Sequence, residues 1–570
     1  MKAEGLKIWA VVFSALVLSL GLSGFVPAKL YEDSVLVMNV EGAVPEYTPF
    51  NPFWGLFAPA PLTVTDKVMV LRKASVDRNV KALVVAVRDN SMGMGKAQEL
   101  RDAILRYRKS GKPAACCIEM EGQADLSYYL ASSCDQIYVS PASFMSVNGL
   151  TQLHFYLGGF FEKVKLSVQV LKVKEYKTFG DTLSRRDMSP FDREMSEALL
   201  NSSWDQFLNG IAAGRNKSKA EIAGYIDQDL LLPEKYQAAG MVDGVKYLDE
   251  VIDGLKKAGG NKDLAVVKER EYAAISPQAL GVNVGPKVAV IYGVGSIVNL
   301  DPGGSPWYGS IMPAEITVME LEEAAKDDSI KGVIFRVDSP GGSALASDLI
   351  WRATQKLREK KPLVVSMSDV AGSGGYYISA GADAIVAHPG TLTGSIGVVS
   401  AHIGARGLLG WLQVGTTVLS KGTYAQVDNW TRPWTESEQA KEMDGITGVY
   451  NLFVDRVSKG RKMSKEDVDK IGKGRVYTGL QAKELGLVDE LGGIDVATEI
   501  IKKKLGVKDL RLVYHRKPIT LWKILLGKTQ EDLVGAMFGP VAVDLKNQLV
   551  LNSMYKDGEK LFLSPTIRLE

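Results

Sequence analysis

The sequence predicts an α/β fold that occurs twice along the chain, and two observations carry this prediction. In the second half, a strand that runs up to Pro340 and a strand that begins at Leu363 are each followed by a glycine-rich turn and a helix, the second helix being expected over 376–386. In the first half, YYLASSCDQIYVSP (128–141) parallels YYISAGADAIVAHP (376–389). Because further segments repeat at nearly the same spacing, the sequence indicates a tandem duplication of one domain.

The two copies differ at the position where a reactive group is expected. In the second copy, Ser373 stands between a strand and a helix in the turn Ala-Gly-Ser-Gly-Gly, so its hydroxyl is presented at a helix N-terminus. The N–H of Gly374 then points to the place where an oxyanion forms. The preceding Pro-Gly-Gly turn carries Gly341 and Gly342, which can supply a second oxyanion donor. The first copy has Asp125 at the position of the serine and lacks this turn.

A serine nucleophile needs a base to remove its proton, and the first half offers one. Lys177 has no counterpart in the second copy, where Ala425 stands at the matching position. Burial lowers the pKa of a lysine, so a buried amine can act as the base near neutral pH. Lys172 and Lys174 are rival candidates, and a Ser-His-Asp triad through His388 is a further alternative. A single site that takes its serine from one half and its lysine from the other explains the asymmetry of the two copies.

The composition bears on which classes of function to expect. A net charge of +2 over 570 residues argues against a dedicated polyanion binder, so we expect no nucleic-acid partner. Three cysteines are too few for a disulfide framework, and neither C-x-x-C nor H-E-x-x-H spacing occurs. We therefore expect neither a metal nor a cofactor. An apolar content of 46% and a charged content of 24% are typical of a globular protein.

The N-terminus carries a candidate membrane anchor. Lys2 and Lys7 precede an apolar run over 8–28, and about twenty apolar residues suffice to cross a bilayer. The flanking lysines predict that the N-terminus stays in the cytoplasm while the rest of the chain is exported. A signal peptide cleaved after Ala28 is the alternative. Because the run is longer than the apolar core of a usual signal peptide, we expect an uncleaved transmembrane anchor over 1–29.

Several motifs resemble those of the signal peptide peptidase A (protease IV) family, peptidase family S49, in its long, duplicated form. They are SDVAGSGGYYISAGADAIVAHPGTLTGSIGVVS, DSPGGSALASDLIW and SKGTYAQV in the second half, and EYKT and RRDMSP in the first. The resemblance covers roughly residues 30 to 506. It implies a ClpP/crotonase-type fold that occurs twice per chain. It also implies a membrane-anchored Ser–Lys endopeptidase that acts on the periplasmic side of the inner membrane, where it degrades signal peptides left after preprotein cleavage.

The resemblance also assigns roles to individual residues. Ser373 matches the family's nucleophile, Lys177 matches its general base, and Ser395 matches the serine that orients the lysine. The glycines of the family's oxyanion corner match three residues: Gly374, Gly341 and Gly342. The family assembles as a homotetramer with an apolar inner groove, so the implied partners are apolar peptides, membrane lipid and further copies of the chain.

These observations divide the chain into four regions, with two other functions left open. We expect an anchor over 1–29, a first copy over 30–270 that supplies the lysine, a second copy over 285–506 that supplies the serine, and an extension over 507–570. An acyl-CoA enzyme of the crotonase type would share the fold and the paired oxyanion donors without needing an exported chain. A membrane scaffold without catalytic activity would retain the fold alone.

Overall fold

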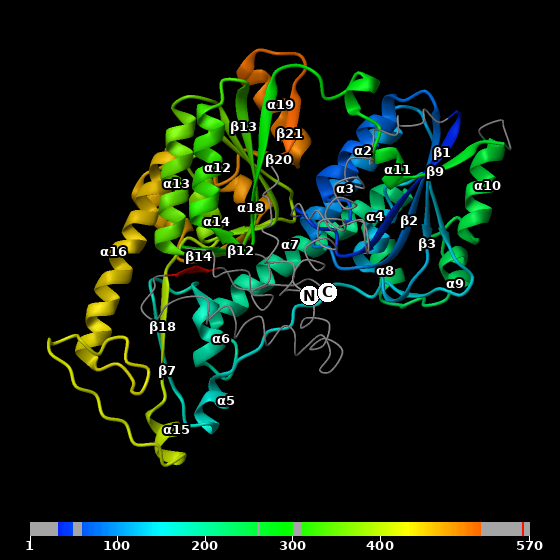
Figure 1. Ribbon diagram of the computed structural model, residues 1–570. Coiled ribbons are helices and arrows are strands. Elements are labelled where there is room, and N and C mark those ends of the chain that lie inside the picture. Colours follow the sequence, from blue (N-terminus) through cyan, green and yellow to red (C-terminus); the bar gives the residue numbers. More distant parts are fainter. Residues whose placement is uncertain (1–31, 49–59, 259–262, 300–310, 515–560, 564–570) are drawn as a thin grey trace, which may run out of the picture.

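The computed structural model describes most of the chain in five stretches: 32–48, 60–258, 263–299, 311–514 and 561–563 (Figure 1). The anchor predicted over 1–29 lies outside them, as does most of the extension predicted over 507–570. Within the described stretches, no helix has both the length and the apolar character that a membrane crossing requires.

A parallel sheet of six strands forms the first half. Its strands, in spatial order, are β8 (Gly244–Val245), β5 (Gln136–Val139), β3 (Ala114–Ile118), β2 (Val80–Asn90), β1 (Ser34–Gly42) and β9 (Ala265–Lys268). The central strands are nearly continuous runs of valine, alanine and leucine, and most of their side chains are fully buried. Such runs are typical of parallel strands covered by helices on both faces.

The helices of the first half connect these strands or follow the last of them, β9. They are α2 (Val64–Val76), α3 (Met94–Arg108), α4 (Asp125–Ala131), α5 (Gly158–Lys163), η1 (Thr178–Gly180), α6 (Asp181–Ser184), α7 (Pro190–Arg215), α8 (Lys219–Ile226), α9 (Pro233–Ala238), α10 (Leu248–Ala258), α11 (Glu269–Ala273) and η2 (Pro277–Leu280). A parallel pair formed by β4 (Glu121–Gln123) and β6 (Phe144–Ser146) lies beside the main sheet.

An eight-stranded sheet forms the second half. Its main path is β19 (Val476–Thr478), β17 (Leu392–Gly394), β15 (Leu363–Gly372), β13 (Ile330–Ser339), β10 (Lys287–Val294) and β21 (Arg511–Tyr514), with β16 (Ala384–Ala387) and β20 (Glu490–Leu491) branching from β15. Its helices are α12 (Ala314–Lys326), α13 (Ala344–Arg358), α14 (Gly374–Ser379), α15 (Arg406–Trp411), α16 (Glu436–Arg461), α17 (Lys465–Ile471), α18 (Gly479–Glu484) and α19 (Ile494–Leu505).

The two halves repeat the same order of elements, as the internal repeat predicts. In each half a strand is followed by a 15-residue helix, α3 or α13, then by another strand and a short helix, α4 or α14. Each half then continues into a 26-residue helix, α7 or α16, which ends on a residue in the left-handed conformation. The helix expected over 376–386 is wrong in its length, because α14 ends at Ser379 and the apolar residues 384–387 instead pair with β15 as a buried parallel strand.

A third sheet joins the halves. Strand β7 (Ser167–Lys172) of the first half pairs antiparallel with β18 (Val399–Gly404) of the second, over six consecutive residues of each (Figure 1). The remaining strands of this sheet are β12 (Ile311–Pro313), β11 (Ser296–Val298), β14 (Gly341–Ser343) and β22 (Leu561–Leu563). Because β7 leads directly toward residue 177, this pairing carries a segment of the first half into the second.

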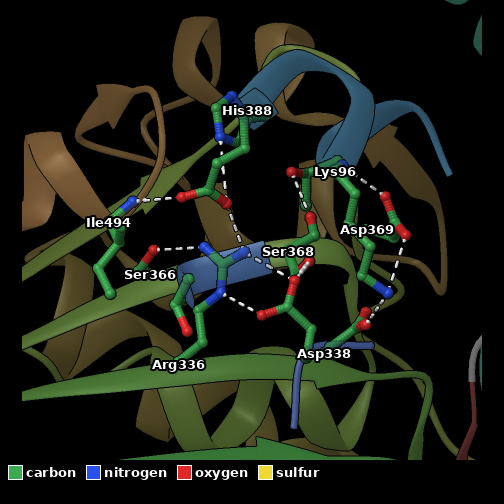
Figure 2. A network of polar contacts seen from close by, with 12 residues as sticks. Lys96, Arg336, Asp338, Ser366, Ser368, Asp369, His388 and Ile494 are labelled. Atoms are coloured by element: carbon green, nitrogen blue, oxygen red, sulfur yellow. Dashed lines mark hydrogen bonds and ion pairs between the residues drawn. The ribbon is translucent and has the colours of Figure 1, made fainter. Parts of the chain in front are cut away.

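A buried ionic cluster lies where the two halves meet (Figure 2). The guanidinium of Arg336, fully buried on β13, donates two hydrogen bonds of 2.8 Å to the carboxylate of Glu46 and also pairs with Glu99 on α3. Burial favours a higher pKa for Glu46, but Arg336 outweighs it and holds that pKa below its ordinary value. The cluster therefore consists of charged groups whose burial is compensated by one another across the contact between the halves.

We expect Arg336→Met to destabilise the fold by about 3–5 kcal/mol, because it leaves two buried carboxylates without their cation. Arg88 is a suitable control, since it forms two ion pairs, with Glu41 and Glu119, at a much more exposed position. Arg88→Met should cost less than about 1 kcal/mol. Denaturant unfolding of both variants measures the difference, and equal losses would mean that the buried cluster adds nothing specific to stability.

Candidate active site

Ser373 stands at a sharp corner between a strand and a helix. It follows the last residue of β15 and precedes the first residue of α14, with φ +52° and ψ −112°. This conformation is rare for a residue with a side chain and costs on the order of 1–3 kcal/mol. The corner is held by two backbone hydrogen bonds, one from the Ser373 N–H to the Gly394 carbonyl and one from the Tyr377 N–H to the Ser373 carbonyl, both 2.8 Å. These bonds fix the strained corner between β15 and α14.

The Pro-Gly-Gly turn at the end of β13 packs against this corner. A Cβ on Gly374 would lie 3.1 Å from the Cα of Gly341 and 3.2 Å from the nitrogen of Gly342, so only glycine permits the approach. Gly342 has φ +155°, and a Cβ there would lie 2.1 Å from the carbonyl oxygen of Ile297. The structure therefore brings together the three glycines predicted for the oxyanion corner.

Lys177 reaches Ser373 from the other half of the chain. Its Nζ lies 2.7 Å from Oγ of Ser373, 2.9 Å from Oγ of Ser395 and 3.1 Å from the carbonyl oxygen of Ser395. The three side chains are fully buried. A neutral amine has one lone pair and two N–H groups, so it can accept the hydroxyl proton of Ser373 while it donates to both oxygens of Ser395.

The surroundings of Lys177 favour its neutral form. Burial lowers its pKa well below the ordinary value of a lysine, and no neighbouring charge offsets this effect. Each of its three hydrogen-bond neighbours is a hydroxyl or a carbonyl group, none of which carries a negative charge. Burial and the lack of a charged partner thus both favour the neutral form of this amine, which is the form that can act as a base.

The segment that carries Lys177 is threaded between elements of the second half. The Val173 N–H donates to the Val398 carbonyl and the Tyr176 N–H donates to the Lys473 carbonyl, each at 3.1 Å. Gly474 allows this passage, because a Cβ there would lie 2.5 Å from the nitrogen of Lys177. Contacts with the second half therefore fix the backbone on which the amine depends.

The rival bases predicted from the sequence lie in other surroundings. Lys172 Nζ pairs with Asp181 at 2.7 Å, and Lys174 Nζ pairs with Asp469 at 2.9 Å. Each of these two amines therefore has a carboxylate as its partner and not the hydroxyl of Ser373. His388 lies in the buried cluster between the halves, with Nε2 3.6 Å from Glu99. Of these candidates, Lys177 is the one that contacts the serine hydroxyl.

Ser395 occupies a second strained turn, immediately after β17. Its φ is +53°, and its N–H donates to the Arg475 carbonyl at 2.7 Å. Because β17 pairs with β15, this turn lies beside the corner of Ser373. Its hydroxyl and its carbonyl oxygen both face the amine of Lys177, which is the arrangement needed to orient a lysine.

The matching corner of the first copy holds a carboxyl group. Asp125 begins α4, is almost fully buried and accepts a hydrogen bond of 2.9 Å from the Gly149 N–H. Burial raises the pKa of Asp125 to about 6.

Among the described residues, no cluster of histidine, cysteine and carboxylate side chains is arranged to hold a metal ion.

The sequence did not indicate that a strand from the end of the chain lies beside the oxyanion corner. β22 runs antiparallel to β14, with Gly341 opposite Leu563 and Ser343 opposite Leu561. It also pairs with Val399 of β18. The backbone edge of Gly341–Ser343 therefore accepts an extended peptide segment. β22 is three residues long and pairs with residues about 200 positions away in the sequence. Such a strand leaves no local pattern from which it could have been predicted.

The comparisons place the chain in a family of peptidases. The model of peptidase family S49 matches residues 106–262 and 355–508, one match in each half and together more than half of the chain. The chain belongs to peptidase family S49, so the predicted resemblance is confirmed. It consists of two tandem domains of mixed α/β structure, and the family supports a serine protease.

Three relatives align over most of their length. The chloroplastic serine protease SPPA of Arabidopsis thaliana is 33% identical over 516 residues, which cover 89% of this chain and 75% of that protein. Protease 4 of Salmonella typhi is 29% identical over 512 residues, covering 87% and 81%. Protease 4 of Haemophilus influenzae is 27% identical over 587 residues, covering 97% and 94%.

A solved structure of a ClpP1 mutant from Listeria monocytogenes is also similar. It covers 36% of this chain and 92% of its own, with 16% sequence identity and a TM-score of 0.23. Because this TM-score is low, the ClpP/crotonase-type fold stays a prediction.

The lowered pKa of Lys177 makes stability depend on pH in a defined direction. The unfolded chain binds a proton at this lysine below about pH 10.4, whereas the folded chain does not until the pH falls to its lowered pKa. Between these limits the wild type gains about 1.4 kcal/mol of unfolding free energy per pH unit from this group as the pH rises. We expect Lys177→Met to lose this part of the slope between pH 8 and pH 10.

Lys172→Met provides the matched control for this measurement, because it removes a lysine of the same segment whose ammonium pairs with Asp181. Denaturant unfolding at several pH values gives the slopes. If Lys177→Met and the wild type show the same slope, the amine of Lys177 is charged in the folded protein.

Proposed function

We propose that this chain is a serine endopeptidase that uses a Ser–Lys dyad, with Ser373 as the nucleophile and Lys177 as the general base. The observation that carries the proposal is the distance of 2.7 Å between Nζ of Lys177 and Oγ of Ser373, in a site where burial lowers the pKa of the amine. A nucleophile within hydrogen-bond reach of a base that a third group orients is the arrangement that activates a hydroxyl. Ser395 is that third group.

The proposed reaction has two steps, and the same amine acts in both. Lys177 takes the proton of Ser373 while Oγ attacks the carbonyl carbon of a peptide bond, and the resulting ammonium gives that proton to the leaving amine. An acyl-enzyme on Ser373 remains. Lys177, neutral again, then takes a proton from water while the water oxygen attacks the carbonyl carbon of the ester. The resulting ammonium returns that proton to Oγ of Ser373 as the ester bond breaks, which releases the acid and restores the serine and the neutral amine. Ser395 holds the amine in line through its hydroxyl and its carbonyl oxygen.

Backbone N–H groups at the glycine corner are the proposed donors to the oxyanion. α14 begins at Gly374, so this amide is among the first of the helix, which have no partner within it. The nitrogen of Gly342 is close enough to act with it. The Gly341 N–H donates to Oγ of Ser339 at 3.2 Å, so we propose that Gly341 shapes the turn, with φ +105°, while Gly342 and Gly374 bind the oxyanion. Each such donor contributes about 10²–10³ in kcat.

The edge of β14 supports a peptide as the substrate. β22 lies there as an antiparallel strand, and an extended peptide can form the same backbone hydrogen bonds. This mode places a peptide backbone beside the Gly341–Gly342 turn and close to Ser373. We propose apolar peptides, specifically signal peptides left in the membrane after preprotein cleavage, as the substrates, in line with the predicted anchor.

We further propose that the protein is a single-pass protein of the inner membrane with its catalytic part on the periplasmic side. The support is the apolar run over 8–28 with Lys2 and Lys7 before it. The relatives named protease 4 and SPPA come from bacteria and from a chloroplast.

Large exposed apolar side chains support the proposed homotetramer. They gather beyond β7 and β18, on the segments around α5 and α15, which lie side by side because a Cβ on Gly407 would contact Lys165 (Figure 1). Exposed members on these segments include Leu153, Phe160, Trp411 and Leu419. Large apolar side chains that are exposed in one region are typical of a surface for protein or lipid contact. We propose that copies of the chain meet there.

The dyad is tested by hydrolysis of an apolar, signal-like peptide. We expect Ser373→Ala and Lys177→Ala each to lower kcat by about 10⁴-fold or more, because the two side chains act as a unit. Lys172→Ala, as a control, should retain wild-type kcat. In the wild type, kcat/KM should fall as the pH is lowered through the pKa of Lys177, since only the neutral amine acts as a base. Full activity of either dyad variant would remove that residue from the mechanism.

The position of β22 leads to a separate prediction. Because β22 occupies the edge of β14 that a substrate needs, a chain that ends at Tyr514 should show a lower KM for peptides of six or more residues. Such a chain retains β21, the last strand of the second sheet. A dipeptide ester, which is too short to pair along the edge, serves as the control and should be hydrolysed equally by both chains. An unchanged KM for the long peptide would mean that substrates bind elsewhere.

A further inference from the structure

The N-terminus of α3, in the first half, lies against the ends of two strands of the second half. Lys96 is in the first turn of this helix, and its Nζ lies 2.8 Å from Oδ2 of Asp338 and 3.2 Å from Oδ2 of Asp369. The three side chains are between 14% and 16% exposed. Figure 2 shows the amine of Lys96 beside the two carboxylates.

Each of the two aspartates precedes one corner of the proposed active site by a few residues. Asp338 is the second-last residue of β13, which leads into the Gly341–Gly342 turn. Asp369 lies near the end of β15, which leads into Ser373. One ammonium group of the first half therefore contacts both strand ends that carry the reactive groups.

The backbone ladder between these strands is interrupted at the same place. β13 and β15 pair regularly up to Val337, and their register shifts before Ser339. In the gap, Oδ1 of Asp338 accepts a hydrogen bond of 3.1 Å from the Val370 N–H. Beyond Val337, side chains thus take over part of the bonding between the strands, and Lys96 holds the carboxylate that does so.

Asp369 also completes the end of α3. Its Oδ1 accepts a hydrogen bond of 2.8 Å from the Lys96 N–H, and its Oδ2 accepts one of 3.2 Å from the Gly93 N–H. The helix has no side-chain cap of its own and no acidic residue in its first turn. A carboxylate from the other half therefore satisfies the N–H groups that a helix leaves open at this end.

Close packing holds the helix end in place. A Cβ on Gly93 would lie 2.5 Å from Cγ of Asp369, and a Cβ on Gly95 would lie 2.7 Å from the Ser368 carbonyl oxygen. Burial favours a lower pKa for Lys96, but Asp338 and Asp369 outweigh it and raise that pKa well above its ordinary value. Lys96 is thus a charged bridge in a rigid contact, unlike Lys177, which has no charged partner.

We propose that Lys96 is a positioning residue, which holds the Gly341–Gly342 turn and Ser373 at the separation that peptide hydrolysis requires. This inference rests on the proposed Ser–Lys endopeptidase. It assigns the first half a second contribution to the site besides the base. The nucleophile and the oxyanion donors must act on one carbonyl group at the same time, and a displacement of about 1 Å between reacting groups can cost about 10²-fold in rate.

The test compares three variants of the full chain on an apolar peptide. We expect Lys96→Met to lower kcat by about 10- to 100-fold with KM within about twofold, because the misplacement affects the transition state more than substrate binding. Lys96→Arg keeps the charge and should restore most of kcat. Lys67→Met is the matched control, since Lys67 is at least as buried as Lys96 and forms an ion pair of 2.8 Å, but with Glu269 of its own half.

The second measurement is the affinity for a peptide boronate, which binds the nucleophile and the oxyanion donors together. Its affinity should fall with kcat in Lys96→Met and stay unchanged in Lys67→Met. An equal loss of kcat in Lys96→Met and Lys67→Met would reduce the effect to general destabilisation. A rise in KM at constant kcat would make Lys96 a substrate contact. Either result overturns the proposal.

Amide hydrogen exchange separates this inference from the proposed function. In Lys96→Met, the Val370 N–H and the amides of 369–375 should exchange at least tenfold faster than in the wild type, while Lys67→Met leaves them unchanged. This measurement needs no catalysis. If the wild type hydrolyses no peptide, the proposed endopeptidase falls, and the exchange rates still decide whether Lys96 holds the two strand ends. Unchanged exchange in Lys96→Met rejects the positioning.

Discussion

The proposed Ser–Lys site depends on a single constraint, which is that the amine of Lys177 must be kept away from water and from carboxylates. Only a desolvated lysine without a charged partner is a base near neutral pH, and its three hydrogen-bond neighbours are two hydroxyl groups and a carbonyl group. Lys172 and Lys174, on the same segment, both lie beside carboxylates. The difference among the three lysines therefore comes from what the second half of the chain presents to each.

This constraint gives a reason for the asymmetry between the two copies. A lysine can be enclosed on all sides only when residues outside its own domain also surround it. β7 brings the segment of Lys177 into the second half by pairing with β18. The first copy, in turn, has Asp125 where the second has Ser373. In the proposed site the first copy supplies the base and the second copy supplies the nucleophile, so neither copy is complete alone. The two copies of the duplicated domain thus contribute different groups to the proposed site.

Charged groups hold the halves in register at two neighbouring points. Arg336 pairs with Glu46 and Glu99, and Lys96 pairs with Asp338 and Asp369. In both cases a cation and its carboxylates come from different halves, so each group loses its partner if the halves separate. Buried ions without partners are costly, which makes the relative placement of the halves specific. Because β13 and β15 lead from these contacts to the glycine turn and to Ser373, the same contacts bear on the geometry of the site.

The sequence by itself determined the duplication, the strand-turn-helix corner of Ser373 and the glycine turn opposite it, because buried runs and glycine turns are local patterns. Residue patterns narrowed the choice of base to a few lysines, and the resemblance to peptidase family S49 assigned Lys177. Only the tertiary structure decided that Lys177 is the one that touches the serine, since the two residues are 196 positions apart and the pKa depends on that contact. The length of α14 and the bridge by Lys96 were likewise decided by packing between segments that are apart in the sequence. The local sequence determines which secondary structure a segment can form, whereas the residues that pack against it determine the contacts and pKa values of its side chains.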